Sequence, residues 1–399
     1  MRVLFLAGAC PYPPDSGGTV RTYNLLKQLC ARHQITLISP ARPGSDLTTA
    51  FGGRLSGIAI AEIPQPGSVR RLAALASTRP YIVASHANRV MRAAVRNALC
   101  SQQFDLLHCD SISVVPAVPR DMRIPKVYNA HNVEAVIWER YVANDRRAWM
   151  RPILRSQLAK VSRYESRLPR MFDCCAAVSE EDRIEMQRRY GARGVVVVPN
   201  GVDLGYYTPL PDPGKPAMVY VGSLDWRPNQ DAVGWLLESI WPRVRSDLPG
   251  ASLAIVGRRP PAWMCDICKQ SGVALHADVP DVRPYLASSS LAIVPLRIGG
   301  GSRLKILEAM AAGRCVISTS VGAEGLEVTD GLDLVVADDA VVFAAQCVSL
   351  LRDRERRQSL AASARSMVEG RYGWDSVALD MEHAWARASR QFGVLETRQ

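Results

Sequence analysis

Short apolar runs alternate with amphipathic stretches along the whole chain, and this pattern constrains the fold more than any other sequence feature. Short continuous apolar runs are typical of strands buried on both faces of a parallel sheet, and the stretches between them predict helices that cover those faces. The predicted strands of the first series are Val3–Ala7, Ile35–Ser39, Ile58–Ile63, Phe104–His108, Lys126–Asn129, Cys174–Val178 and Val195–Val198. Those of the second series are Ala217–Gly222, Ser252–Val256, Val273–His276, Leu291–Pro295, Cys315–Thr319 and Leu332–Val336.

A proline-rich segment separates the two series. Four prolines within residues 208–216 cannot continue a helix or a sheet ladder. We therefore expect two doubly wound, Rossmann-like α/β domains, at residues 1–207 and 208–375, and a C-terminal helix at 376–399 that packs back on the first domain. Ligands of such sheets bind beyond the carboxyl ends of the strands, so the expected site is a central cleft that both domains face.

Nothing in the sequence indicates export or a metal centre. The N-terminal apolar run is short and ends before a proline-rich turn, and no stretch reaches the roughly 20 apolar residues that cross a bilayer, so we expect a cytoplasmic protein. Cys265 and Cys268 have metal-like spacing, but no second pair completes four ligands, and two thiols on a short helix is the simpler interpretation. No Asp-x-Asp stands at a strand end, so no metal or other cofactor is expected.

Positive charge is concentrated in the N-terminal half. Residues 1–200 carry 28 Lys and Arg against 15 Asp and Glu, within a chain of net charge +11. This asymmetry favours an anionic partner, which would be nucleic acid, an anionic membrane surface or a phosphate-bearing substrate. No aromatic base-stacking motif accompanies the charge, so nucleic acid is the least favoured of the three.

Many of these cations recur at spacings of three and four residues, with apolar residues between them. This pattern predicts a helix with a cationic face, which would lie on anionic lipid or near a lipid acceptor, or would simply be solvated. The residues concerned are Arg146, Arg147, Arg151, Arg155, Lys160, Arg163, Arg167 and Arg170.

The segment from Leu291 to Thr319 carries the most chemical information, because it reads as strand, glycine loop and helix. Three glycines allow close approach of a ligand, Ser302 can cap the helix, and a helix N-terminus attracts anions. Arg303 and Lys305 oppose the helix dipole, and a bound diphosphate would explain both cations. Glu308 would accept hydrogen bonds from a ribose diol, or would be a solvated glutamate.

This segment, Leu-Lys-Ile-Leu-Glu-Ala-Met-Ala-Ala-Gly-x-x-Val-Ile, resembles the donor-binding segment of retaining family-4 glycosyltransferases with the GT-B fold. Val198–Asp203, Ala177–Glu180 and His131-Asn132 agree in order and spacing, so the resemblance covers nearly the whole chain. It implies transfer of a hexose, with retention and without a metal, from a nucleotide-sugar donor to a lipid-linked saccharide or polysaccharide acceptor. Such reactions belong to polysaccharide and exopolysaccharide biosynthesis.

The donor-binding residues that the resemblance implies are Gly222, Arg227, Gly299, Gly300, Gly301, Ser302, Arg303, Lys305, Leu307 and Glu308. Two departures accompany them. Gly300 stands where the family usually has the first of two glutamates, so this chain looks like the subgroup with Gly-Gly-(Ser/Thr)-Arg-x-Lys-x-Leu-Glu. Ser223 and Arg227 replace a Gly-Arg and a following lysine, and Arg227 is either a compensating phosphate ligand or a surface residue.

In the first half, the loop at residues 13–21 resembles the family's glycine loop, and a Gly-x-Gly-x-x-Gly fingerprint is absent from it. Its candidate acceptor or phosphate contacts are Asp15, Gly17, Gly18 and Arg21, of which Asp15 and Arg21 would otherwise only set the turn. The resemblance gives His131 a hydrogen bond to the donor sugar, and the alternative is a histidine bonded to nearby backbone.

The implied catalytic residues are therefore His131, Glu308, Arg303 and Lys305. Three rival interpretations stay open. They are a nucleotide-sugar epimerase or inverting transferase on the same fold, a catalytically silent sugar-nucleotide or lipid-binding partner, and, on charge alone, a nucleic-acid-binding protein.

Overall fold

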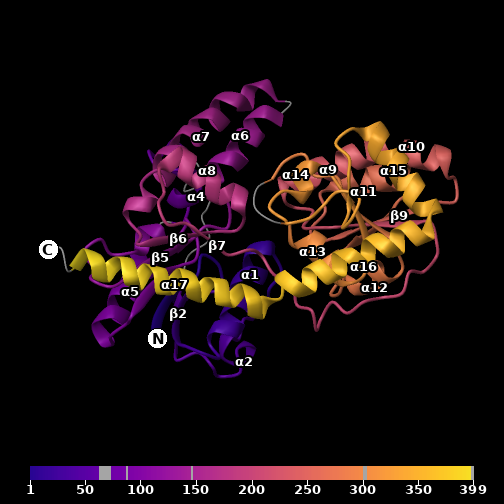
Figure 1. The fold of residues 1–399 in the computed structure, drawn as a ribbon. Coiled ribbons are helices and arrows are strands. Elements are labelled where there is room, and N and C mark those ends of the chain that lie inside the picture. Colours follow the sequence, from indigo (N-terminus) through magenta and orange to yellow (C-terminus); the bar gives the residue numbers. More distant parts are fainter. Residues whose placement is uncertain (63–72, 87–88, 145–146, 300–302, 397–399) are drawn as a thin grey trace. The chain divides into compact units, whose positions relative to one another are not determined.

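The computed structural model describes residues 1–62, 73–86, 89–144, 147–299 and 303–396. These residues form two compact units, the first of residues 1–199 and 374–399 and the second of residues 200–373. Each unit is a parallel sheet with helices on its faces (Figure 1). Every predicted strand of both series is present, with ends that differ by a few residues.

Unit 1 contains a seven-stranded sheet of order β3-β2-β1-β4-β5-β6-β7, and all its pairs are parallel. The strands are β1 (Arg2–Leu6), β2 (Gln34–Pro40), β3 (Gly57–Ala61), β4 (Leu106–Cys109), β5 (Lys126–Asn129), β6 (Cys174–Ala177) and β7 (Val196–Val197). The helices are α1 (Gly17–Leu29), α2 (Leu47–Ala50), α4 (Tyr81–Ala84), α5 (Arg89–Ser101), η1 (Val115–Ala117), α6 (Glu134–Asn144), η2 (Ala148–Met150), α7 (Arg151–Glu165), η3 (Leu168–Arg170), α8 (Glu180–Tyr190) and α17 (Trp374–Glu396).

Unit 2 repeats this plan with a six-stranded parallel sheet of order β10-β9-β8-β11-β12-β13. Its strands are β8 (Ala217–Val221), β9 (Ser252–Gly257), β10 (Ala274–Ala277), β11 (Leu291–Val294), β12 (Cys315–Ser318) and β13 (Val335–Val336). Its helices are α9 (Arg227–Trp235), η4 (Leu236–Ile240), α10 (Trp241–Asp247), α11 (Ala262–Gln270), α12 (Arg283–Ala287), α13 (Leu304–Ala311), α14 (Ser320–Ala323), α15 (Ala340–Arg352) and α16 (Arg354–Arg371).

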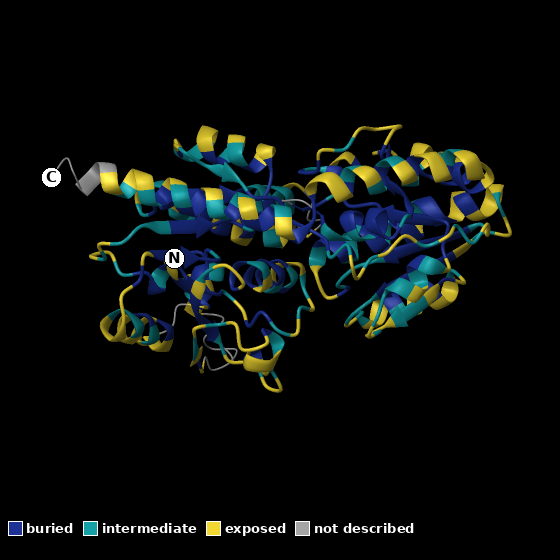
Figure 2. Cartoon of the chain, turned by 60° about the horizontal axis from the view of Figure 1, so that its bottom comes forward, coloured by how far each residue is buried: buried dark blue, intermediate teal, exposed yellow. Residues whose placement is uncertain are grey.

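The central strands are buried because helices cover both faces of each sheet. Figure 2 shows strands in the buried class beneath helices whose outer faces are exposed. The apolar residues of β1 are fully buried, as are those of β11 and β12 to within a few per cent. The apolar runs of the sequence therefore form the two cores.

Strand order determines where ligands bind in such sheets. In each unit the chain reverses direction across the sheet between the first and fourth strands of its series, β1 and β4 in unit 1 and β8 and β11 in unit 2. Crevices at the carboxyl ends of strands at such switch points are the usual ligand sites of doubly wound folds.

The proline-rich segment belongs to unit 2, and the boundary between the units falls before it, at Pro199. Leu210 N–H donates to the carbonyl of Ala312 (3.1 Å), and the buried Arg314 donates to the carbonyl of Pro211 (2.9 Å). The backbone groups that the prolines leave without sheet partners are thus bonded within unit 2. The chain returns to unit 1 at Trp374, where α17 packs on β5, β6, β7 and α1.

Within the described residues, no helix combines the length and apolarity needed to span a bilayer. Cys265 and Cys268 both lie on α11, and no cluster of three or more metal-binding side chains occurs in the described part of the chain.

Candidate functional site

At the switch point of unit 2, β8 ends before Gly222 and the loop after β11 leads into α13. Helix α13 begins at Leu304, and Arg303 occupies its N-cap position in an extended conformation. Arg303 therefore precedes the helix, while Lys305 lies in its first turn. The roles expected for Gly300, Gly301 and Ser302, including the cap at Ser302, lie outside the described residues.

Lys305 is held by two side chains of the same unit. Its Nζ donates to Asn229 Oδ1 (2.8 Å) and to the hydroxyl oxygen of Tyr220 (3.1 Å), and it lies 4.5 Å from the centre of the Tyr220 ring. Tyr220 is fully buried and its hydroxyl donates to Asn229 Oδ1 (2.8 Å). Burial, assisted by the charge of Arg303, lowers the pKa of Lys305 to about 7.

Gly222 leaves the space that this ammonium group occupies. A Cβ atom at position 222 would lie 2.7 Å from Lys305 Nζ and 3.1 Å from Asn229 Nδ2. A side chain there would therefore displace both groups. Asn229, 2% exposed, also donates to the carbonyl of Ser223 (2.8 Å) and so fixes the loop after β8.

Glu308 lies one turn after Lys305 on α13 and is half-buried. Burial raises its pKa to about 6, although a hydrogen bond with Tyr207 and the charge of Lys305 oppose that rise. The carboxylate is thus ionised at neutral pH and can accept hydrogen bonds. Leu307, in contrast, is fully buried in the core of unit 2.

The two predicted arginines of unit 2 occupy different environments. Arg303 is 6% exposed and its guanidinium group packs directly against Gly299, where any side chain would collide with it. Arg227 is the first residue of α9 and is half-buried. The start of the loop after β11 is bonded to α9, because Arg297 donates to both carboxylate oxygens of Asp231 (2.7 and 3.0 Å).

In unit 1, His131 follows β5 and its side chain is 23% exposed. Its Nε2 lies 3.2 Å from Asp110 Oδ1. Its Nδ1 lies toward the start of α1, where a Cβ atom at Gly18 would be 3.4 Å away. The structure therefore places the predicted histidine at the N-terminus of α1, and gives it a side-chain partner rather than a backbone partner.

Asp110 is the residue that the sequence interpretation missed. It follows β4 at the switch point and is 1% exposed. Burial alone would raise its pKa, but the contacts with His131 and His108 outweigh burial and hold that pKa well below its usual range. One signal could have found it: a carboxylate directly after an apolar strand, at the place where the strand order reverses.

Arg21 is a structural residue. It is 1% exposed and donates to the carbonyls of Pro199 (2.6 Å) and Val198 (2.8 Å) and to Asn129 Oδ1 (3.1 Å). Of the two roles that the sequence leaves open for Arg21, these bonds favour the structural one, because the guanidinium group joins α1 to the end of β7.

The other candidates of that loop lie at the surface. Asp15 forms an ion pair with Arg42 (2.7 Å), and both side chains are about one-third exposed. Gly17 and Gly18 are exposed at the start of α1. Of the predicted loop residues, Gly18 is thus the one that lies beside His131.

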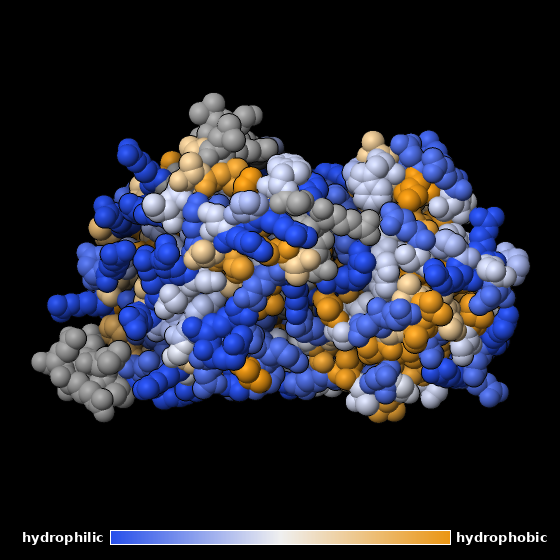
Figure 3. Space-filling view, turned by 90° about the horizontal axis from the view of Figure 1, so that it is seen from above, coloured by the Kyte–Doolittle hydropathy of each residue, from blue (hydrophilic) through white to orange (hydrophobic). Residues whose placement is uncertain are grey.

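The predicted cationic helix is α7, flanked by η2 and η3. Leu154 and Val161 face the core, and the single acidic residue of α7, Glu165, is buried. The exposed cations of this region are Arg147, Arg151, Arg155, Arg163, Arg167 and Arg170, whereas Lys160 donates to the carbonyl of Leu75 and Arg146 lies outside the described residues. Seen from above, the molecule shows mostly hydrophilic side chains with hydrophobic ones between them (Figure 3).

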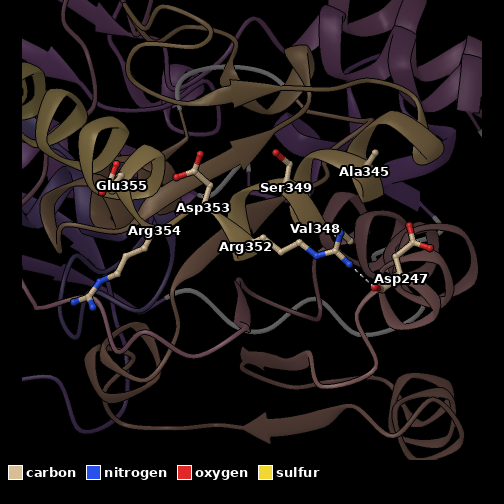
Figure 4. Close-up of a pocket in the computed structure, with 8 residues that line it drawn as sticks. All are labelled: Asp247, Ala345, Val348, Ser349, Arg352, Asp353, Arg354 and Glu355. Carbon is tan, nitrogen blue, oxygen red and sulfur yellow. Dashed lines mark hydrogen bonds between the residues drawn. The ribbon is translucent and has the colours of Figure 1, made fainter.

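A separate hollow of about 740 Å³ lies between the end of α10 and the junction of α15 and α16 (Figure 4). Arg352 donates to the carbonyl of Asp247 (2.8 Å) across it. None of the predicted site residues lines this hollow.

Solved structures share this fold over nearly their whole length. Sucrose-phosphate synthase from Thermosynechococcus elongatus has a TM-score of 0.75 at 16% identity and covers 97% of this chain and 98% of its own. HepE of Anabaena, solved with UDP-glucose, has a TM-score of 0.65 at 14% identity, with 97% and 99% covered. WaaG, described as a glycosyltransferase involved in lipopolysaccharide biosynthesis, has a TM-score of 0.67 at 17% identity, with 96% and 98% covered. The chain therefore has the GT-B fold of glycosyltransferases.

Family models assign the chain more specifically than its fold does. The model "Glycosyltransferase Family 4" matches residues 16–206, and "Glycosyl transferases group 1" matches residues 215–353. The chain belongs to this GT-B superfamily of group 1 and family 4 glycosyltransferases. Two curated relatives are similar: a D-inositol 3-phosphate glycosyltransferase of Xylanimonas cellulosilytica (28% identity over 55% of this chain) and an uncharacterized 44.6 kDa protein in the cps region of Klebsiella pneumoniae (26% over 39%). The alignments span 58% and 42% of these relatives, about half their length.

Proposed function

We propose that this protein transfers a hexose from a nucleotide-sugar to a lipid-linked saccharide or polysaccharide acceptor, with retention and without a metal. The observation that carries the proposal is the Lys305 cluster. A glycine, a buried asparagine and a lysine of lowered pKa meet at the switch point of unit 2, one turn from Glu308. Structural neighbours solved with UDP and UDP-glucose support a nucleotide-sugar as the donor.

In the proposed reaction, cations and the start of α13 stabilise the charge that develops on the departing nucleoside diphosphate. Lys305, Arg303 and Arg227 supply that positive charge, and Glu308 accepts hydrogen bonds from the ribose. The acceptor hydroxyl attacks the anomeric carbon on the face that the diphosphate leaves. Its proton passes to the leaving phosphate, so the step balances without a further base.

The first experiment is a binding and hydrolysis screen of UDP-, GDP- and ADP-sugars in the presence of EDTA. Lys305→Met and Glu308→Gln should each strongly weaken binding of the donor that the wild type selects. Lys269→Met, which removes an exposed lysine on α11, is the matched control and should bind normally. Binding without turnover by any tested acceptor would favour the silent partner, and no binding at all would refute the donor site.

We also propose that unit 1 docks on the cytoplasmic face of a membrane through η2 and the start of α7. Trp149 is 69% exposed and Ile153 41% exposed, and Arg147, Arg151 and Arg155 flank them. Exposed apolar side chains among arginines suit the interface of an anionic bilayer.

Flotation with vesicles tests this docking. The wild type should float with vesicles rich in phosphatidylglycerol and not with pure phosphatidylcholine vesicles. A Trp149→Ser, Arg151→Ser double variant should lose flotation, whereas Trp263→Ser, which removes an exposed tryptophan of α11, should keep it. Equal flotation of both variants would contradict the proposed surface.

A further inference from the structure

Asp110 is a buried carboxylate that three side chains approach within hydrogen-bonding distance. Thr22 Oγ1 on α1 donates to its Oδ2 (2.5 Å), and Asn129 Nδ2 at the end of β5 donates to its Oδ1 (2.6 Å). His131 Nε2 approaches the same Oδ1 at 3.2 Å. The carboxylate is therefore held in one orientation, with no freedom to turn away from the histidine.

A second histidine, His108 of β4, also approaches Asp110. Trp385 Nε1 on α17 donates to His108 Nδ1 (3.1 Å), so the proton of a neutral His108 must lie on Nε2. That Nε2 lies 3.5 Å from Asp110 Oδ1, and the ring stacks on Phe5 with centroids 4.2 Å apart. His108 thus directs an N–H toward Asp110. Together with the donors Thr22 and Asn129, this favours the ionised carboxylate.

An ionised carboxylate only accepts hydrogen bonds, so His131 must carry its proton on Nε2. The other ring nitrogen, Nδ1, then has a free lone pair. It lies beside Gly18 at the N-terminus of α1, where the absence of a side chain leaves access to it.

We infer that Asp110 is a positioning residue that fixes the Nε2–H tautomer of His131, so that Nδ1 is presented beside Gly18 as the acceptor for a sugar hydroxyl. That the hydroxyl belongs to a substrate rests on the proposed function. Asp110 itself is buried and acts through the histidine.

The tautomer is tested by ¹⁵N NMR of the imidazole groups in the full chain at about pH 8.5, two units above the ordinary histidine pKa. His131 is assigned by the signal lost in His131→Gln. The inference requires a protonated Nε2 and an unprotonated Nδ1 in the wild type, and a mixed or reversed tautomer in Asp110→Ala. An Nδ1–H wild type, or an unchanged tautomer in Asp110→Ala, would overturn it. If Asp110→Ala does not fold, the wild-type tautomer and the Gly18→Ala variant still test the inference.

Gly18→Ala provides the second test, because its Cβ would lie against Nδ1 while alanine favours the helix. It should keep the wild-type melting temperature and nucleotide affinity but lose turnover by about 100-fold, the usual cost of displacing a reacting group by about 1 Å. Unchanged turnover would refute the role of Nδ1. If the wild type binds no nucleotide at all, the proposed function is refuted. The NMR test of the tautomer does not depend on nucleotide binding.

Discussion

Lys305 shows how the tertiary structure changes the chemistry of a single residue. The sequence predicts a permanently charged phosphate ligand, whereas burial beside Tyr220 lowers its pKa to about 7. A pKa of about 7 makes the group partly neutral near pH 7. A bound diphosphate would favour the ammonium form, so binding and protonation are coupled.

We expect the affinity for UDP to fall as the pH rises from 7 to 9, because Lys305 must take up a proton to bind the diphosphate. Calorimetric titrations in two buffers of different ionisation enthalpy would measure that uptake directly. Lys305→Met should bind weakly with no pH dependence over this range, and Lys269→Met should follow the wild type. Proton uptake of zero in the wild type would contradict this assignment.

At the scale of elements, two glutamates with different roles lie at the start of α6, one on α6 itself and one on α7. Glu165 of α7 is buried and accepts from the backbone N–H groups of Glu134 (2.8 Å) and Ala135 (3.0 Å), so it satisfies the first turn of α6. Among the described residues, none donates a hydrogen bond to the side chain of Glu134, the first residue of α6. Burial, together with the charges of Glu165 and Asp182, raises its pKa to about 8.

Glu134→Gln should therefore stabilise the protein at high pH. The folded carboxyl holds its proton up to about pH 8, while the unfolded one loses it near the ordinary glutamate pKa of 4.5, so stability decreases as the pH rises between these values. We expect a higher melting temperature for the variant at pH 8.5 and little difference at pH 4.5. Glu181→Gln, at an exposed position of the first turn of α8, is the control and should show no gain at pH 8.5.

Arg21 provides a second element-scale test, because it joins α1 to two carbonyls after β7. Arg21→Met should lower the free energy of unfolding by about 2–4 kcal/mol, since it leaves buried acceptors without a charged donor. Urea unfolding measures this loss, with the exposed Arg193→Met as control. A turnover defect without destabilisation would instead support a contact between Arg21 and the acceptor.

At the scale of the whole molecule, each unit has its own hydrophobic core, and the chain passes from one unit to the other at Pro199 and again at Gly373. The last helix, α17, completes unit 1 rather than unit 2. Its Trp385 is fully buried, and it contacts both His108 and His33 edge-on. The C-terminal segment thus supports the sheet that carries His131.

Trp385→Ala should destabilise unit 1 selectively, by about 3–5 kcal/mol, the usual cost of removing a buried tryptophan. In calorimetry we expect one unfolding transition to shift down while the transition that the nucleotide selected in the binding screen stabilises keeps its position. Trp263→Ala, at an exposed site of α11, should shift neither transition. Equal shifts of both transitions in Trp385→Ala would show that the two units unfold together.

The sequence by itself determined the two sheets. Runs such as Val3–Ala7 and Leu291–Pro295 are continuously apolar, so they predict buried strands without any knowledge of tertiary contacts. It also placed His131, Lys305 and Glu308 after strands or at a helix start, since chain order alone predicts those positions. It did not determine that Arg21 is structural, that Leu307 lies in the core, or that Asp110 holds His131. Those assignments depend on contacts between residues distant in sequence, and only the tertiary structure brings such groups within hydrogen-bonding distance.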